Sequence, residues 1–126
     1  MNGMLEVIVK NESDIYEESI LEEGVEFIGL INKQGKMENT IFKNEFNLTK
    51  ERMAMLSMEL RLQSSMQSDF DSEFGLVSFN VTEREKLKFV TMTFFPYVVL
   101  AVMKKDIDHI PIIDKINKNI QRLQGV

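Results

Sequence analysis

The chain has 126 residues, enough for one domain with a substantial hydrophobic core but not for two. Apolar residues make up 44% and charged residues 28%, which is typical of a globular protein and excludes a disordered or fibrous chain. The formal net charge of -5 argues against a nucleic-acid-binding role, because contact with phosphate requires clustered lysine and arginine. We expect a single globular domain, residues 1–126, without a nucleic-acid partner.

The sequence contains no cysteine, which excludes disulfides, thiolate metal sites and cysteine nucleophiles and favours a cytoplasmic setting. The apolar stretch near the N-terminus lacks a basic region and is interrupted by Glu6, so no signal peptide is predicted. The apolar run Val98–Met103 is only about a third of the length that crosses a bilayer. It is therefore predicted to be a buried strand, and no membrane partner is expected.

Residues 11–23 are predicted to form the first helix, because Asn11 or Ser13 can cap its start and Gly24 can end it. Its apolar side consists of Ile15, Tyr16, Ile20 and Leu21.

A β-hairpin follows the first helix. The β-rich runs at 25–32 and 37–42 are separated by residues 33–36, which include Gly35, the residue type expected in a hairpin turn. Gly29 lies inside the first run, where glycine is typical of a β-bulge or of close packing under a helix.

The segment 49–66 is predicted to be a helix with two apolar stripes, capped by Asn47 or Thr49. Successive residues of a helix are rotated by about 100°, so one stripe consists of Met53, Leu56 and Leu60, with Ser57 and Ser64 beside them. The opposite stripe consists of Met55, Met58, Leu62 and Met66. The first stripe can cover the sheet of the same chain. Leaving the second in water would forgo on the order of 6 kcal/mol, at about 1.5 kcal/mol for each side chain.

Three explanations for the second stripe stay open: a subunit interface, a core face covered by the N-terminal residues 4–9, and a ligand groove. A subunit interface is favoured, because a second subunit would recover the free energy that the exposed stripe forgoes, while residues 4–9 stay the second candidate for the cover.

Three more strands are predicted at Leu76–Val81, Leu87–Phe94 and Tyr97–Met103. The connections between them are too short for parallel crossovers, so the strands form an antiparallel meander. A final helix starts at Asp108 and Pro111, and one of its faces carries Ile113, Ile116, Ile120 and Leu123. The predicted class is α+β, with a five-stranded antiparallel sheet flanked by helices in the order α-β-β-α-β-β-β-α.

This order resembles the roadblock, or dynein light chain, family within the profilin-like fold. The resemblance covers nearly the whole chain and is carried by Phe27–Lys36, by the helix with two stripes, and by the closing meander with its helix. The sequence also resembles a family of small, uncharacterised archaeal proteins, in the hairpin with its glycine and in the segments Met58–Arg61, Asp69–Gly75 and Arg84–Lys86.

The roadblock resemblance implies a homodimer or heterodimer built by the middle helix and the strand after it, with the two sheets joined edge to edge. Carried over, the interface residues are Met55, Met58, Leu62 and Met66 on the helix and Leu76, Ser78 and Asn80 on the strand. Roadblock-like proteins serve as scaffolds and as partners or regulators of small GTPases. The resemblance implies that role class, with the chain itself or a related subunit as its partner.

No catalytic, cofactor-binding or metal-binding residue is predicted. His109 is the only histidine, which excludes histidine triads and multi-histidine metal sites within one subunit. Asp69, Asp71 and Glu73 would point the same way from an extended backbone and could face a hard cation, but the glycine and distal glutamate of an EF-hand loop are missing. The chain is therefore not expected to be an enzyme.

The alternative function is a small-molecule sensor domain of the PAS or GAF type, which holds its ligand between sheet and helix. That function requires inward-pointing polar groups, for which Thr91, Thr93, Ser78 and Asn80 are the candidates.

Overall fold

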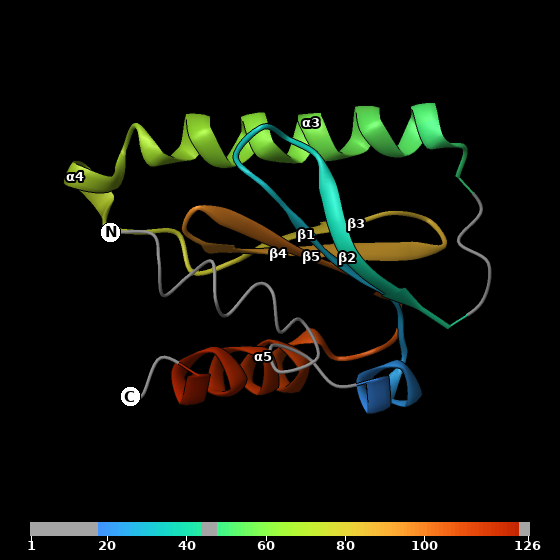
Figure 1. Cartoon of the computed structure of the whole chain (residues 1–126). Helices are drawn as coiled ribbons and strands as arrows, with labels where there is room; N and C mark the ends of the chain where they lie inside the picture. Colours follow the sequence, from blue (N-terminus) through green and yellow to red (C-terminus); the bar gives the residue numbers. More distant parts are fainter. Residues whose placement is uncertain (1–17, 44–47, 124–126) are drawn as a thin grey trace.

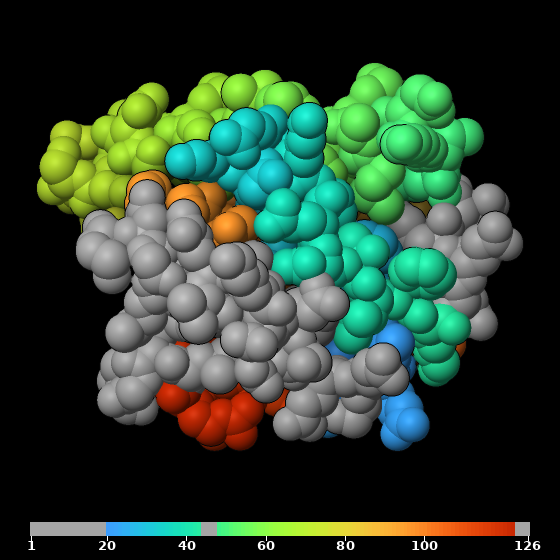
Figure 2. Space-filling model, viewed as in Figure 1, coloured from blue at the N-terminus to red at the C-terminus, as the bar shows by residue number. Residues whose placement is uncertain are grey.

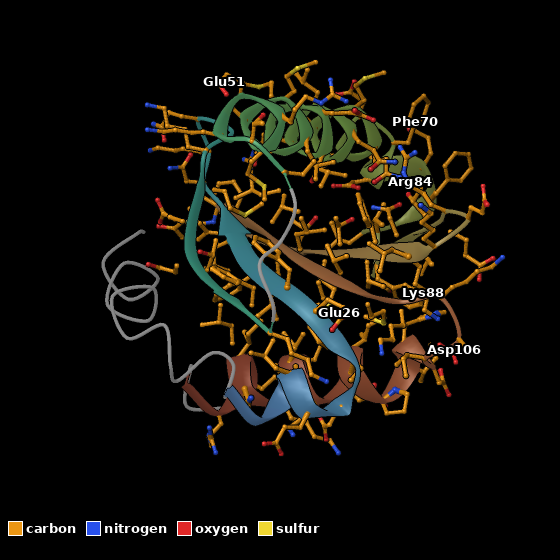
Figure 3. The ribbon with its side chains drawn as sticks, turned by 90° about the vertical axis from the view of Figure 1, so that its right-hand side faces the viewer. Glu26, Glu51, Phe70, Arg84, Lys88 and Asp106 are labelled. Carbon is orange, nitrogen blue, oxygen red and sulfur yellow. The ribbon has the colours of Figure 1, made fainter. Side chains whose placement is uncertain are left out.

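The computed structural model describes residues 18–43 and 48–123. In this part of the chain a five-stranded sheet lies between two helical layers (Figure 1). Helix α3 (Lys50–Ser68) covers one face, and α5 (His109–Leu123) covers the other together with the short 3₁₀ helix η1 (Glu18–Glu23). The side view in Figure 3 shows the same layers, with side chains filling the space on both sides of the sheet. The predicted α+β class with a five-stranded antiparallel sheet is confirmed.

The strands are β1 (Val25–Ile31), β2 (Met37–Phe42), β3 (Asn80–Glu83), β4 (Leu87–Phe94) and β5 (Tyr97–Lys104). Their order in the sheet is β2-β1-β5-β4-β3, and every neighbouring pair is antiparallel. Strand β5 is central, and its residues 98–103 are buried, as predicted from their unbroken apolar run. Within the described chain, β2 and β3 are the sheet edges.

The predicted hairpin between β1 and β2 is confirmed. Gly35 adopts a φ of 82°, which favours glycine, and its amide donates to the carbonyl of Asn32 at 2.9 Å. The Asn32 side chain accepts from the amides of Gln34 and Lys36 at 2.9 and 3.1 Å, which holds the turn closed. Gly29 lies where the β1–β2 register shifts, so the predicted bulge is confirmed. A Cβ there would come within 2.8 Å of Met37 Sδ, so the close packing is against strand β2 and not under a helix.

The first predicted helix differs from the structure where it can be compared. Residues 11–17 lie outside the described ranges, and η1 is a single 3₁₀ segment rather than the end of an α-helix. Ile20 is buried under the sheet, and Gly24, with a φ of 102°, ends the segment as expected.

The strand predicted at Leu76–Val81 starts too early. Helix α3 continues to Ser68, the short helix α4 (Asp71–Phe74) follows, and Gly75 turns the chain with a φ of 83°. Pairing with β4 begins only at Asn80. Phe79 instead packs its ring against His109, with the ring centroids 5.8 Å apart, so Leu76–Phe79 crosses toward the α5 side before the ladder starts.

The core is divided by the sheet. On the α3 side it contains Phe27, Ile31, Leu60, Val98, Leu100 and Val102. On the α5 side the helix contributes Ile112, Ile113, Ile116 and Ile120. The predicted apolar face of the last helix is thus confirmed for Ile113, Ile116 and Ile120, while the side chain of Leu123 lies outside the description. No helix within the described ranges is long and apolar enough to cross a membrane.

Candidate interaction surface

Helix α3 begins with the cap that its sequence predicts. Thr49 Oγ1 accepts a hydrogen bond from the amide of Arg52 at 3.1 Å, which satisfies one of the free donors of the first turn. The other predicted cap, Asn47, lies outside the described ranges.

The inner stripe of α3 covers the sheet, as predicted. Leu60 and Ser57 are buried, and Met53 and Leu56 pack against the α3-side core from partly buried positions. These contacts account for one of the two apolar stripes.

The outer stripe of α3, defined as Met55, Met58, Leu62 and Met66, is exposed. The exposed fractions of these side chains are 59%, 44%, 55% and 67%, respectively. Met58 is the least exposed because it lies against the hairpin: its Sδ would be 2.9 Å from a Cβ at Gly35. Figure 2 shows this hairpin turn resting against α3. A helix that covers its own sheet therefore presents a second apolar face that the described chain leaves uncovered.

The apolar surface extends past α3 through residues that the sequence interpretation missed. Phe70 and Phe74 are 57% and 84% exposed, and their rings stack with centroids 6.2 Å apart. Leu76, which was predicted to belong to the interface, follows at 82% exposure. The sequence signal was the spacing of Met66, Phe70 and Phe74 at i, i+4 and i+8, although the helix breaks between Ser68 and Asp71 and the spacing alone does not place them on one face.

This short helix also overturns the geometry behind the metal candidate. Asp71 and Glu73 lie on α4 and Asp69 lies at the C-terminal cap of α3, so the three do not alternate along an extended backbone. Among the described residues no group of three or more acidic, histidine or cysteine side chains could hold a metal ion.

One flank of α3 is tied to the sheet by hydrogen bonds. Arg61 Nη1 donates to the Pro96 carbonyl at 2.8 Å, and the hydroxyls of Ser64 and Thr93 lie 3.2 Å apart. These contacts fix the rotation of the helix, and hence the direction in which the outer stripe faces.

Asn80 belongs to this contact between α3 and the sheet. Its amide and that of Gln67 exchange two hydrogen bonds, at 2.7 and 2.9 Å, and its nitrogen also lies 3.3 Å from Thr91 Oγ1. The side chain of Asn80 is thus engaged within the chain, whereas Ser78 is exposed. Of the three strand residues that the resemblance implied, Leu76 and Ser78 are available to a partner through their side chains.

Replacing Gln67 and Asn80 by alanine, singly and together, is expected to show coupling between them. Each single change should lower the free energy of unfolding by about 1–2 kcal/mol, because the remaining amide loses two partners. The double variant should lose about 1 kcal/mol less than the sum. Urea unfolding of the four proteins measures this; purely additive losses would contradict the pairing.

The polar groups required by the sensor alternative have other partners. Asn80 and Thr93 bond to α3, the Thr91 hydroxyl lies within hydrogen-bonding distance of Asn80, and Ser78 is exposed. These four side chains therefore do not serve as the inward-pointing groups that the sensor alternative requires of them.

The contacts of His109 are structural, because they join two elements of the fold. Its Nδ1 lies 3.0 Å from Nζ of Lys88, a buried lysine on the α5 side of the sheet (Figure 3). Nζ of Lys88 can only donate in this contact, so Nδ1 of His109 is the acceptor. This contact joins β4 to the start of α5, and it organises no further acid or nucleophile.

Comparison with known proteins finds no matching family model and no matching curated protein. Solved structures do match. A Roadblock/LC7 domain from Streptomyces avermitilis aligns with a TM-score of 0.63 at 10% identity, over 81% of this chain and 84% of that one. The gliding protein MglB from Thermus thermophilus aligns with a TM-score of 0.62 at 11% identity, over 90% and 83%.

A third match is MglC from Myxococcus xanthus, with a TM-score of 0.58 at 15% identity, over 90% of this chain and 98% of that one. The resemblance to archaeal proteins is not tested by these matches and stays a prediction. The matches span most of each chain and share its sheet and helices, although the identities are too low to carry function. They confirm the first resemblance at the level of structure: the chain has a roadblock-like fold.

Proposed function

We propose that this chain is a non-enzymatic interaction module that dimerises through α3 and the β3 edge and acts as a scaffold or regulatory subunit. The observation that carries the proposal is the outer stripe of α3: four large apolar side chains, each at least 44% exposed, on a helix whose other face is already buried. A continuous exposed apolar surface of this kind is typical of protein interfaces.

The outer stripe suits a two-fold axis. In a symmetric dimer the same patch serves both subunits, and two antiparallel copies of α3 place the N-terminal half of one against the C-terminal half of the other. Met55 would then meet Met66 of the partner subunit, and Arg52 would lie near the acidic end of the partner's helix. Methionine adapts its shape to such contacts better than branched side chains do.

The β3 edge supports the same assembly. Strand β3 pairs with β4 only, so its outer backbone groups have no ladder partner among the described strands. Pairing of two such edges would extend the sheet across the dimer. Leu76 and Ser78 precede this edge and are exposed toward a partner.

The resemblance to roadblock-like proteins supports the proposed regulatory role. Roadblock-like proteins serve as scaffolds and as partners or regulators of small GTPases, and MglB and MglC are among the structures that match. We propose a small GTPase or a related signalling protein as the further partner, bound by the dimer rather than by one chain. No arrangement of acid, base and nucleophile in the described chain favours catalysis instead.

The solution mass tests the proposal. Light scattering over a hundredfold range of protein concentration should give a mass near twice 14.7 kDa throughout, because burial of both outer stripes stabilises the pair. A mass of 14.7 kDa at every concentration would contradict the proposal.

A further inference from the structure

A groove lies between β2 and the N-terminal half of α3, where Met53 and Ser57 of the inner stripe contribute to its lining. Its volume is about 590 Å³, within the range of sites that bind small molecules. Apolar side chains dominate its lining: Phe27, Met37, Phe42, Leu48 and Met53. The rings of Phe27 and Phe42 stack at 6.5 Å between centroids and form a flat apolar wall.

Ser57 is a buried polar residue in this lining. Its side chain is 0% exposed, and its Oγ has no hydrogen-bond partner among the residues that the structure describes. A buried hydroxyl without a partner costs about 1–3 kcal/mol. A ligand atom in the groove that accepts from this hydroxyl would recover that free energy.

Positive charge surrounds the opening. Lys36 and Lys50 both line the groove and are exposed, and Lys50 begins α3, where the helix dipole adds a partial positive charge. Lys36 belongs to the hairpin turn that touches Met58, the residue next to Ser57. Lys36 and the buried donor Ser57 therefore both belong to the lining of this apolar groove, in a chain whose net charge is -5.

We propose that this groove binds a long-chain carboxylate. The alkyl chain lies along Phe27, Phe42 and Met53, and the carboxylate accepts from Ser57 Oγ and pairs with the Lys36 ammonium at the open end. The proposal uses no residue of the outer stripe, although Met58 adjoins the groove through its contact with Gly35 of the lining.

Titration calorimetry with dodecanoate below its micelle concentration tests this site. We expect saturable binding of one dodecanoate per chain. Ser57→Ala and Lys36→Gln should each weaken binding about tenfold, because each removes a hydrogen bond to a charged group. Ala54→Phe, at the groove lining, should abolish binding by filling the space.

The matched control is Ser65→Ala, which removes an exposed hydroxyl from the same helix outside the groove and should leave dodecanoate affinity unchanged. Dodecanol should bind at least tenfold more weakly than dodecanoate, since it lacks the charge. The proposal is overturned if the unaltered chain shows no saturable binding, if Ser57→Ala and Ala54→Phe bind normally, or if dodecanol binds equally well.

Discussion

Replacing Leu62 and Met66 together by glutamate is expected to convert the proposed dimer into folded monomers. Both side chains are more than half exposed in the single chain, so the substitutions disturb no packing within the subunit. In an antiparallel dimer they would bring four carboxylates into an apolar contact, where a charge without a partner costs several kcal/mol. We expect the dissociation constant to rise at least a hundredfold, or about 3 kcal/mol.

Light scattering at several concentrations measures the change, and circular dichroism checks that the helices remain. Met58 is a poorer choice for this experiment, because its side chain packs on Gly35 and glutamate there would also disturb the hairpin.

The matched control places the same pair of substitutions on the opposite helical layer. Asn117 and Gln121 are exposed on α5 with the same i, i+4 spacing, and α5 lies across the sheet from α3. Asn117→Glu with Gln121→Glu adds the same charge to each chain and should leave the dimer intact. A dimer that survives Leu62→Glu with Met66→Glu would place the interface elsewhere on the molecule.

The structural features predicted best from the sequence are those in which the spacing of apolar residues reflects their burial. The two stripes of α3 were separated correctly because a helix of 19 residues repeats its pattern several times, and burial of Leu60 against exposure of Leu62 follows from that pattern. The central position of β5 was predicted for a similar reason, since a strand covered on both faces cannot alternate. These features depend on each residue's own environment.

Features that depend on a partner far along the chain were not predicted. Nothing in β1 indicates that it pairs with β5, and nothing in Leu76–Phe79 shows that the ladder with β4 begins only at Asn80. The role of Asn80 was missed for the same reason, because its amide partner Gln67 lies thirteen residues earlier on another element. The groove beside Ser57 is formed by the packing of α3 against β2, which no local pattern encodes.

Gly24→Ala is expected to give the largest loss of stability among single substitutions of the turn residues. Gly24 has a φ of 102°, a conformation that costs a residue with a Cβ about 1–2 kcal/mol. A Cβ there would also lie 2.6 Å from Cγ1 and 2.7 Å from Cδ1 of Ile107, which packs against the α5-side core. Overpacking of this kind adds about 1–3 kcal/mol. The total loss should be roughly 2–5 kcal/mol in the free energy of unfolding.

A double-mutant cycle with Ile107→Ala separates the two causes. Ile107→Ala alone should cost about 1–3 kcal/mol through lost packing, and it removes the atoms that an alanine at position 24 would meet. In that background Gly24→Ala should cost only the backbone contribution, so the double variant should be more stable than additivity predicts by about 1–3 kcal/mol. Urea unfolding of the four proteins at one protein concentration measures the cycle. If the two losses add, the contact with Ile107 is not the cause, and the left-handed backbone alone explains why glycine occupies the junction between η1 and β1.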